Sequence, residues 1–295
     1  MPMINYVEFF SGCLGGVAGV LVGQPFDTVK VRLQTQSGTS LYRGVWHCLT
    51  SIVKNESPRG LFKGMSSPLL GLSFINAIVF GVQAQVITFL GRETTYTHFI
   101  SGAFAGAVQC VICAPMELAK TQMQVQGIGK KAKKSDNMYK SSIDCIKKIY
   151  KSHGMKGCYK GMTLTLMRET PAFGCYFASY DILTSTVLLV DKTETYQLGT
   201  ILKMMLSGGI AGILSWVITY PFDVLKSRLQ ADHFENSKYK GTIDCLKKGI
   251  EKEGPRLLYR GLNSTIIRAF PVNAATFAVV QVSTQYFYKK KNGYP

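Results

Sequence analysis

Charged residues recur at fixed spacing at the ends of three otherwise apolar stretches. After each of three prolines come an acid two residues on, a base five on and a glutamine nine on. The three sets are Asp27, Lys30 and Gln34 after Pro25, Glu117, Lys120 and Gln124 after Pro115, and Asp223, Lys226 and Gln230 after Pro221. Steps of three and four residues share one helix face, so each acid and base point the same way. Because charges at membrane depth are costly unless paired, we expect acids of one helix to meet bases of the next.

A second group of residues could bind a small charged molecule. Each proline set is followed by an aromatic–basic–glycine step that ends at position 64, 161 or 261. Seven residues past these glycines stand Gly71, Arg168 and Arg268, and twelve past stand Asn76, Phe173 and Asn273. Arginine binds carboxylates through paired hydrogen bonds, whereas the neighbouring Glu169 can hold a cation. These residues predict a site for a zwitterion or a cation that carries a carboxylate. Adjacent helix residues point about 100° apart, so we do not expect Arg168 and Glu169 to bind each other.

The apolar stretches before the prolines predict membrane helices. Residues 9 to 26, 99 to 116 and 204 to 222 are almost free of charge, and each can cross or nearly cross a bilayer core of about 30 Å. The net charge is +17 although only 17% of residues are charged, which favours an anionic surface. Long, glycine-rich apolar stretches make a membrane a better partner than nucleic acid. The N-terminus lacks a basic region, so we expect no cleavable signal.

The whole chain reads as a threefold repeat of one transport domain, residues 1–295. The prolines are 90 and then 106 residues apart, which divides the chain at about residues 1–95, 96–195 and 196–295. Each repeat predicts a membrane helix, a short amphipathic surface helix and a second membrane helix. The fold class is therefore all-α, with six transmembrane helices and both termini on one side. Pairs of glycines four residues apart should let helices approach closely: Gly12 and Gly16, Gly102 and Gly106, and Gly208 and Gly212.

The eight cysteines do not form an extracellular disulfide pattern. Cys48, Cys145 and Cys245 stand at equivalent places in the three surface helices, which predicts repeated packing positions. The four histidines are scattered, and neither a phosphate-binding loop nor a metal-ligand cluster is visible. We therefore expect a non-enzyme without a metal or cofactor.

The threefold Pro-x-acid-x-x-base frame, the aromatic–basic–glycine steps and the repeat length resemble the mitochondrial carrier family over essentially the whole chain. The resemblance implies tilted helices around a central cavity, alternating access and a monomer in the mitochondrial inner membrane. It places both termini toward the intermembrane space, the surface helices on the matrix side, and cardiolipin as a structural lipid near the matrix-side helix ends. It also implies that the proline sets form a matrix gate, with Asp27 paired to Lys120, Glu117 to Lys226 and Asp223 to Lys30.

Two segments narrow the resemblance to one branch of the family. "LMRETPAFGCYF" around Arg168 and "IIRAFPVNAATF" around Arg268 resemble carriers for basic amino acids, ornithine and carnitine. Carnitine carriers usually have Arg-Asp where this chain has Arg168-Glu169, which favours lysine, arginine, ornithine or histidine. We assign Arg268, assisted by Arg168, to the substrate carboxylate and Glu169 to an amino group. The resemblance also implies that the residues five before the prolines face the cavity, namely Val20, Cys110 and Trp216. The Trp216 indole can hold a cation, and Trp216, Asn76 and Asn273 would set the length and shape of the substrate. A carnitine or acylcarnitine carrier and a non-transporting solute- or lipid-binding scaffold remain alternatives.

A second gate in the family uses an aromatic, an acid and a base nineteen, twenty and twenty-three residues past each glycine. Here these positions hold Gln83, Ala84 and Ile87, then Tyr180, Asp181 and Thr184, then Val280, Gln281 and Thr284. Asp181 alone is charged and has no basic partner in this set. We therefore expect Tyr180 and Asp181 to form a weak cytoplasmic gate, with uniport beside exchange.

Overall fold

The computed structural model describes residues 6–36, 41–91, 94–126, 139–188, 198–232, 234 and 237–291. Within these ranges the chain is helical and contains no strand. The six long helices are α1 (Tyr6–Thr35), α3 (Ser66–Leu90), α4 (Thr95–Val125), α6 (Met162–Ile182), α7 (Leu198–Ala231) and α9 (Leu262–Lys291). The short helices are α2 (Val45–Glu56), α5 (Ser142–Cys158) and α8 (Thr242–Glu253), with single turns η1 (Pro58–Phe62), η3 (Leu183–Val187) and η4 (Pro255–Tyr259). Each repeat thus has the predicted order of long, short and long helix.

Three segments are long and apolar enough to cross a membrane by length and composition alone. Among the described residues they are Thr95–Val125 in α4, Lys203–Ala231 in α7, and Pro255–Thr284 across η4 and α9. A shorter apolar stretch, Phe74–Leu90, lies in α3. The remaining long helices pack beside these: α1 runs along α9, and α6 lies against both α4 and α7.

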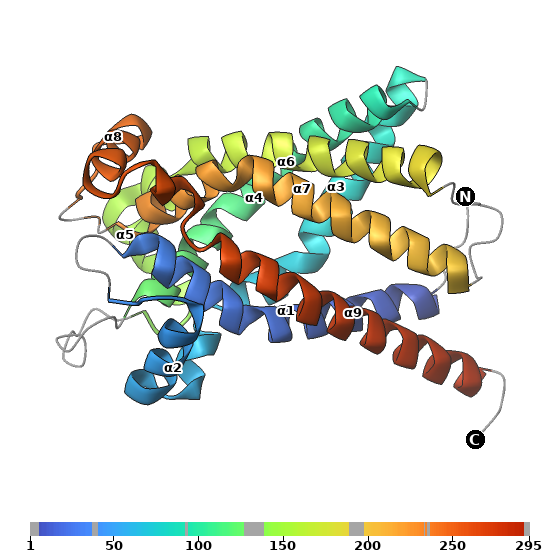
Figure 1. Cartoon of the computed structure of the whole chain (residues 1–295), viewed down its shortest axis with the longest axis horizontal. Coiled ribbons are helices and arrows are strands. Elements are labelled where there is room, and N and C mark those ends of the chain that lie inside the picture. Colours follow the sequence, from blue (N-terminus) through green and yellow to red (C-terminus); the bar gives the residue numbers. More distant parts are fainter. Residues whose placement is uncertain are drawn as a thin grey trace.

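The helices are arranged as a bundle with two different ends (Figure 1). The short helices α2, α5 and α8 gather at one end, and α1 begins and α9 ends at the opposite end. Helices α1, α4 and α7 continue through Pro25, Pro115 and Pro221, and contact one another pairwise. The acids and bases that follow these prolines are therefore brought to one part of the bundle.

The second repeat has the predicted close helix contact. A Cβ on Gly102 would lie 2.6 Å from the carbonyl oxygen of Phe173, and one on Gly106 would lie 2.7 Å from that of Glu169. Only glycine fits where the backbones of α4 and α6 approach so closely. This contact positions α6, which carries two of the candidate site residues.

In the other two repeats, Gly12, Gly208 and Gly212 do not make the predicted close contact with another helix. In α1 the side chains of α9 lie against Gly15, Gly19 and Gly23, whereas nothing lies within 4 Å of a Cβ on Gly12. In α7, Gly208 and Gly212 do not pack against another helix backbone but line a cavity. The spacing shows which helix face could approach a neighbour, but the neighbour's position decides whether it does.

The surface helices are held by the repeated cysteines, as predicted. Cys48, Cys145 and Cys245 each have no exposed surface and belong to three separate apolar clusters. Burial raises the pKa of the Cys48 and Cys145 thiols to about 12 and that of Cys245 to about 11. These thiols stay protonated and act as small apolar side chains.

Candidate functional site

Six charged residues form an ion-pair ring where α1, α4 and α7 meet. Lys120 Nζ lies 2.6 Å from Asp27 Oδ2, and Lys30 Nζ lies 2.8 Å from Asp223 Oδ2. Lys226 contacts Glu117 in the third pair. All three pairings that the resemblance implies are therefore present, each between different repeats. Together they link the three helices at the end of the bundle that carries the surface helices.

The glutamines of the proline sets are buried beside this ring but are not equivalent. Gln34 donates a hydrogen bond of 2.9 Å to Asp223 Oδ2, within the ring. Gln124 donates to the Thr28 hydroxyl at 3.2 Å, and Gln230 accepts from Thr121 at 3.4 Å. Of these three contacts, only that of Gln34 reaches a charged residue of the ring.

Arg168 is bound by carboxylates of the ring and by its own neighbour. Its Nη2 lies 2.9 Å from Glu117 Oε1 and also contacts Glu169, and its Nε lies 3.7 Å from Asp223 Oδ1. The expectation that Arg168 and Glu169 do not bind each other is therefore wrong. Their Cβ atoms point apart, but the long arginine side chain turns back far enough to reach the carboxylate. Both residues are buried, with exposed fractions of 7% and 5%.

Arg268 is the second arginine that contacts the ring. Its Nε lies 2.9 Å from Asp27 Oδ1, so this acid has cationic partners from both α4 and α9. A Cβ on Gly23 would lie 2.9 Å from Arg268 Nε, so the glycine leaves space for the arginine to cross α1. Arg268 is less buried than Arg168, with 28% of its side chain exposed.

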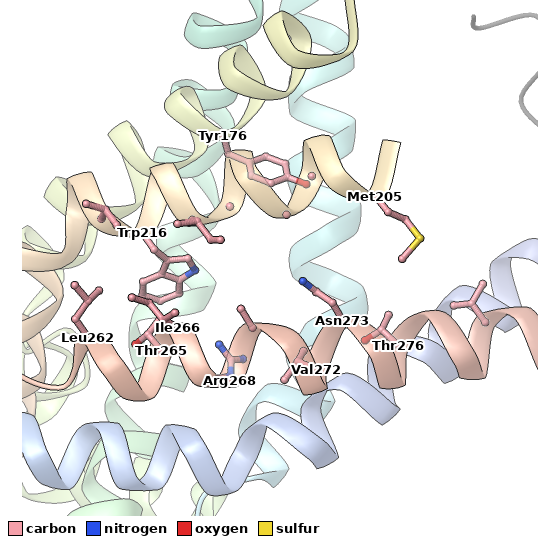
Figure 2. Close-up of a pocket in the computed structure, with 17 residues that line it drawn as sticks. Tyr176, Met205, Trp216, Leu262, Thr265, Ile266, Arg268, Val272, Asn273 and Thr276 are labelled. Atoms are coloured by element: carbon pink, nitrogen blue, oxygen red, sulfur yellow. The ribbon is translucent and has the colours of Figure 1, made fainter. Parts of the chain in front are cut away.

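A cavity of about 480 Å³ lies beside the ring, between α7 and α9. Figure 2 shows three of the predicted site residues in its wall: Trp216 on α7, and Arg268 and Asn273 on α9. Most of the remaining wall is apolar, and Tyr176 from α6 adds a second aromatic ring. The cavity can therefore offer one cationic group, one amide and two aromatic rings to a ligand.

Four predicted site residues do not line the cavity: Arg168 and Glu169 lie against the ring, and Gly71 and Asn76 lie elsewhere. Gly71 is buried, and a Cβ there would overlap the side chain of Met116 on α4, so this glycine is a packing position. Asn76 is exposed on α3 and does not line the cavity. Positions that are equivalent in the repeats thus have different surroundings, because the three helix pairs do not pack alike.

The indole of Trp216 is already next to two cations. Lys30 Nζ lies 4.3 Å from the centre of the indole ring, and Arg168 Cζ lies 5.4 Å from it. Cations at these distances are attracted by the electron density of the ring face. Trp216 therefore contacts both the cavity and the ion-pair ring.

At the opposite end of the bundle, Asp181 has partners that the sequence did not indicate. Thr95 Oγ1 donates to Asp181 Oδ2 at 2.8 Å, and His98 Nε2 lies 3.7 Å from Oδ1. His98 lies near the start of α4, outside the positions counted from the glycines, so the counting did not indicate this neighbour of Asp181. Tyr180 stacks on Tyr176, with ring centres 6.4 Å apart.

Two charge clusters near the surface helices were missed. Glu56 accepts hydrogen bonds from Arg32 at 2.5 and 2.9 Å and from Lys63 at 2.7 Å. Burial raises the pKa of Glu56, but these ion pairs outweigh it and hold that pKa below its ordinary value. Glu253 binds Arg228 and Arg260 in the same way in the third repeat. The sequence contains a pattern that could have predicted both clusters. In the first and third repeats an arginine stands seven residues after the proline of the Pro-x-acid-x-x-base frame, and a glutamate stands eight residues before the glycine of the aromatic–basic–glycine step.

One cluster in the described part of the chain has the donor types of a metal site. Cys113, Glu117 and Glu169 have donor atoms within 4.8 Å of one another. Both carboxylates already bind Arg168, and Glu117 also binds Lys226. A metal ion would therefore have to displace these cationic side chains.

Comparison with known proteins decides the family. The model of the family described as "Mitochondrial carrier protein" matches residues 3–94, 91–189 and 198–291. The chain belongs to the mitochondrial carrier family. It is thus a multi-pass protein of a mitochondrial membrane, from a family that transports small molecules.

Several curated relatives of this carrier are similar along nearly the whole chain. The mitochondrial basic amino acids transporter of Homo sapiens is 52% identical over 282 residues, covering 95% of this chain and 90% of the relative. That of Rattus norvegicus is 51% identical, covering 95% and 89%. The Glutamate/glycine mitochondrial carrier ymc1 of Schizosaccharomyces pombe is 37% identical over 289 residues, covering 95% and 94%. Because these relatives are named for different amino acids, the family alone does not fix the substrate.

Proposed function

We propose that this carrier moves basic amino acids, namely lysine, arginine, ornithine and histidine, across the mitochondrial inner membrane by alternating access. The observation that carries the proposal is the position of the Arg168 guanidinium. It binds the carboxylate of Glu169 and lies 5.4 Å from the Trp216 ring centre. A site that holds a guanidinium between a carboxylate and an indole suits the side chain of a basic amino acid. The names of the mammalian relatives support the same substrate class.

Arg268 is the residue best placed for the substrate carboxylate. It lines the cavity and keeps part of its side chain exposed, whereas Arg168 is buried among three acids. A substrate carboxylate that binds Arg268 competes with Asp27 for the same guanidinium. Asp27 then loses one of its two cationic partners, which favours opening of the ring toward the matrix.

The cationic end of the substrate would take the place that Arg168 now occupies beside Glu169. This changes the role of Arg168 from a second carboxylate ligand to a side chain that holds the closed ring. When a substrate cation binds Glu169, Arg168 loses that contact and keeps its contacts with Glu117 and Asp223. The net charge of the site changes little, because one cation replaces another.

The remaining features of the proposal follow the family arrangement. The matrix gate consists of the ion-pair ring with its three glutamines, and both termini face the intermembrane space. The protein works as a monomer without a cofactor or enzymatic activity, and cardiolipin binds near the matrix-side helix ends. Tyr180 and Asp181 form the cytoplasmic gate. Asp181 is the single charged residue among the nine family gate positions, so this gate closes weakly, the empty carrier can also reset, and uniport accompanies exchange.

Carnitine is the second candidate substrate, since an indole in the cavity wall can also hold a quaternary ammonium group. Uptake of labelled arginine into liposomes that contain the purified protein separates these possibilities. We expect lysine, ornithine and histidine to compete with arginine, and carnitine and choline to compete weakly or not at all. Strong carnitine uptake with weak arginine uptake would replace the proposed substrate class. An absence of flux for every compound would favour a scaffold that binds without transporting.

A further inference from the structure

Three side chains of the candidate substrate site contact the ion pairs of the ring. Arg268 binds Asp27, and Arg168 binds Glu117 and lies 3.7 Å from Asp223. The third contact is different, because Trp216 lies against a base, Lys30. We propose, on the basis of the function proposed above, that Trp216 is a positioning residue: its indole holds Lys30 in the closed ring and exchanges it for the cationic end of the substrate.

The surroundings of Lys30 explain why an indole matters there. Its Nζ lies 2.8 Å from Asp223, 4.3 Å from the Trp216 ring centre and 5.5 Å from that of Tyr220. Only 8% of the residue is exposed, so water replaces little of what these partners provide. All three partners stand on α7, and together they bind α1 to α7. The indole is the only one of them that also lies in the cavity wall.

The other two repeats lack this arrangement. The positions equivalent to Trp216 hold Val20 and Cys110. By the repeat symmetry, Val20 is the counterpart of Trp216 for Lys120, and Cys110 is its counterpart for Lys226. Neither a valine nor a cysteine side chain can attract an ammonium group as an indole does. A ring that only had to close would not need an aromatic residue at one position of three. The difference points to a role in recognising an asymmetric substrate.

The position of Trp216 allows the exchange. Figure 2 shows its side chain in the space between α7 and α9, on the wall that also carries Arg268 and Asn273. A substrate bound to Arg268 by its carboxylate therefore shares a cavity with the indole. The substrate cation that takes the place of Arg168 beside Glu169 also contacts the indole, so Lys30 loses its contact with Trp216 and keeps Asp223 and Tyr220. A substrate with a neutral side chain leaves Lys30 where it is.

The contact with Lys30 can be tested without any substrate. We would measure thermal unfolding of the purified carrier for Trp216→Leu, Lys30→Gln and the double variant. We expect the double variant to lose less stability than the sum of the two single variants, because both single changes remove the same contact between Trp216 and Lys30. Val20→Leu, at the equivalent position of the first repeat, should add independently to Lys30→Gln. Fully additive shifts for Trp216→Leu would overturn the contact.

The exchange is tested by comparing arginine with citrulline, whose side chain has the same shape but no charge. In liposomes, Trp216→Leu should lower the ratio of arginine to citrulline uptake by about 2- to 30-fold, the range expected for one cation–π contact. Trp216→Phe keeps an aromatic face and should give an intermediate ratio, which controls for misfolding of the leucine variant. An unchanged ratio in both variants would overturn the exchange. If the wild-type carrier does not transport arginine, the proposed function fails, whereas the thermal cycle still decides the contact between Trp216 and Lys30.

Discussion

The ring predicts unequal effects from removing the two members of one ion pair. Asp27 has two cationic partners, Lys120 at 2.6 Å and Arg268 at 2.9 Å, whereas within the described residues the Lys120 ammonium is paired with Asp27 alone. Asp27→Asn therefore leaves two cations without their carboxylate. Lys120→Gln leaves Asp27 still bound to Arg268. The acid should contribute more to the stability of the closed ring than the base opposite it.

The magnitudes follow from burial and distance. The side chains of Asp27 and Lys120 are 15% and 21% exposed, so removing the acid corresponds to breaking a largely buried pair, at about 3 to 5 kcal/mol. Removing the base leaves a partnered carboxylate and should cost about 1 kcal/mol, as for a partly exposed pair. In thermal unfolding without substrate, we expect a decrease of about 6 °C or more for Asp27→Asn and about 2 to 4 °C for Lys120→Gln. Equal decreases, or a larger decrease for Lys120→Gln, would refute this reasoning.

Three further predictions concern individual positions. Gly23→Ala should displace Arg268 and slow arginine exchange several-fold, whereas Gly12→Ala, with nothing within 4 Å of the new Cβ, should exchange at the wild-type rate. Ser57 has φ 73° and ψ 163°, a conformation that favours glycine, so Ser57→Gly should raise the free energy of unfolding by about 1 to 3 kcal/mol; a lower melting temperature would count against this. The lowered pKa of Glu56 means that its ion pairs stabilise the fold above pH 4.5 and are lost as the pH falls through the folded-state pKa, so the stability difference between wild type and Glu56→Gln should shrink in acid.

The threefold repeat made the ring predictable from the sequence. Asp27, Glu117 and Asp223 occupy the same place in each repeat, and related helices must bring related residues together. Position counting also placed Trp216, Arg268 and Asn273 in one cavity wall, because α7 and α9 carry them on facing sides. Periodicity is sufficient for such features, since they depend only on helix geometry.

The wrong predictions share a physical cause. The direction of a Cβ atom does not limit a long side chain, which is why Arg168 reaches Glu169. Small-residue spacing does not identify the partner helix, which is why Gly208 lines a cavity. The position counting also missed the contact of Asp181 with His98, because His98 lies on α4, outside the counted gate positions. Each of these contacts depends on tertiary packing that differs between the repeats.

The central claim is that a basic amino acid opens the ring by binding Arg268 in the cavity beside it. The most direct test is the initial rate at which labelled arginine enters liposomes loaded with unlabelled arginine, compared between Arg268→Gln and Arg256→Gln. Arg256 is an exposed residue of η4 and serves as the matched control. Because a charge-assisted hydrogen bond is lost, Arg268→Gln should exchange about 10- to 100-fold more slowly, while Arg256→Gln exchanges at the wild-type rate. Exchange at the wild-type rate by Arg268→Gln would contradict the claim.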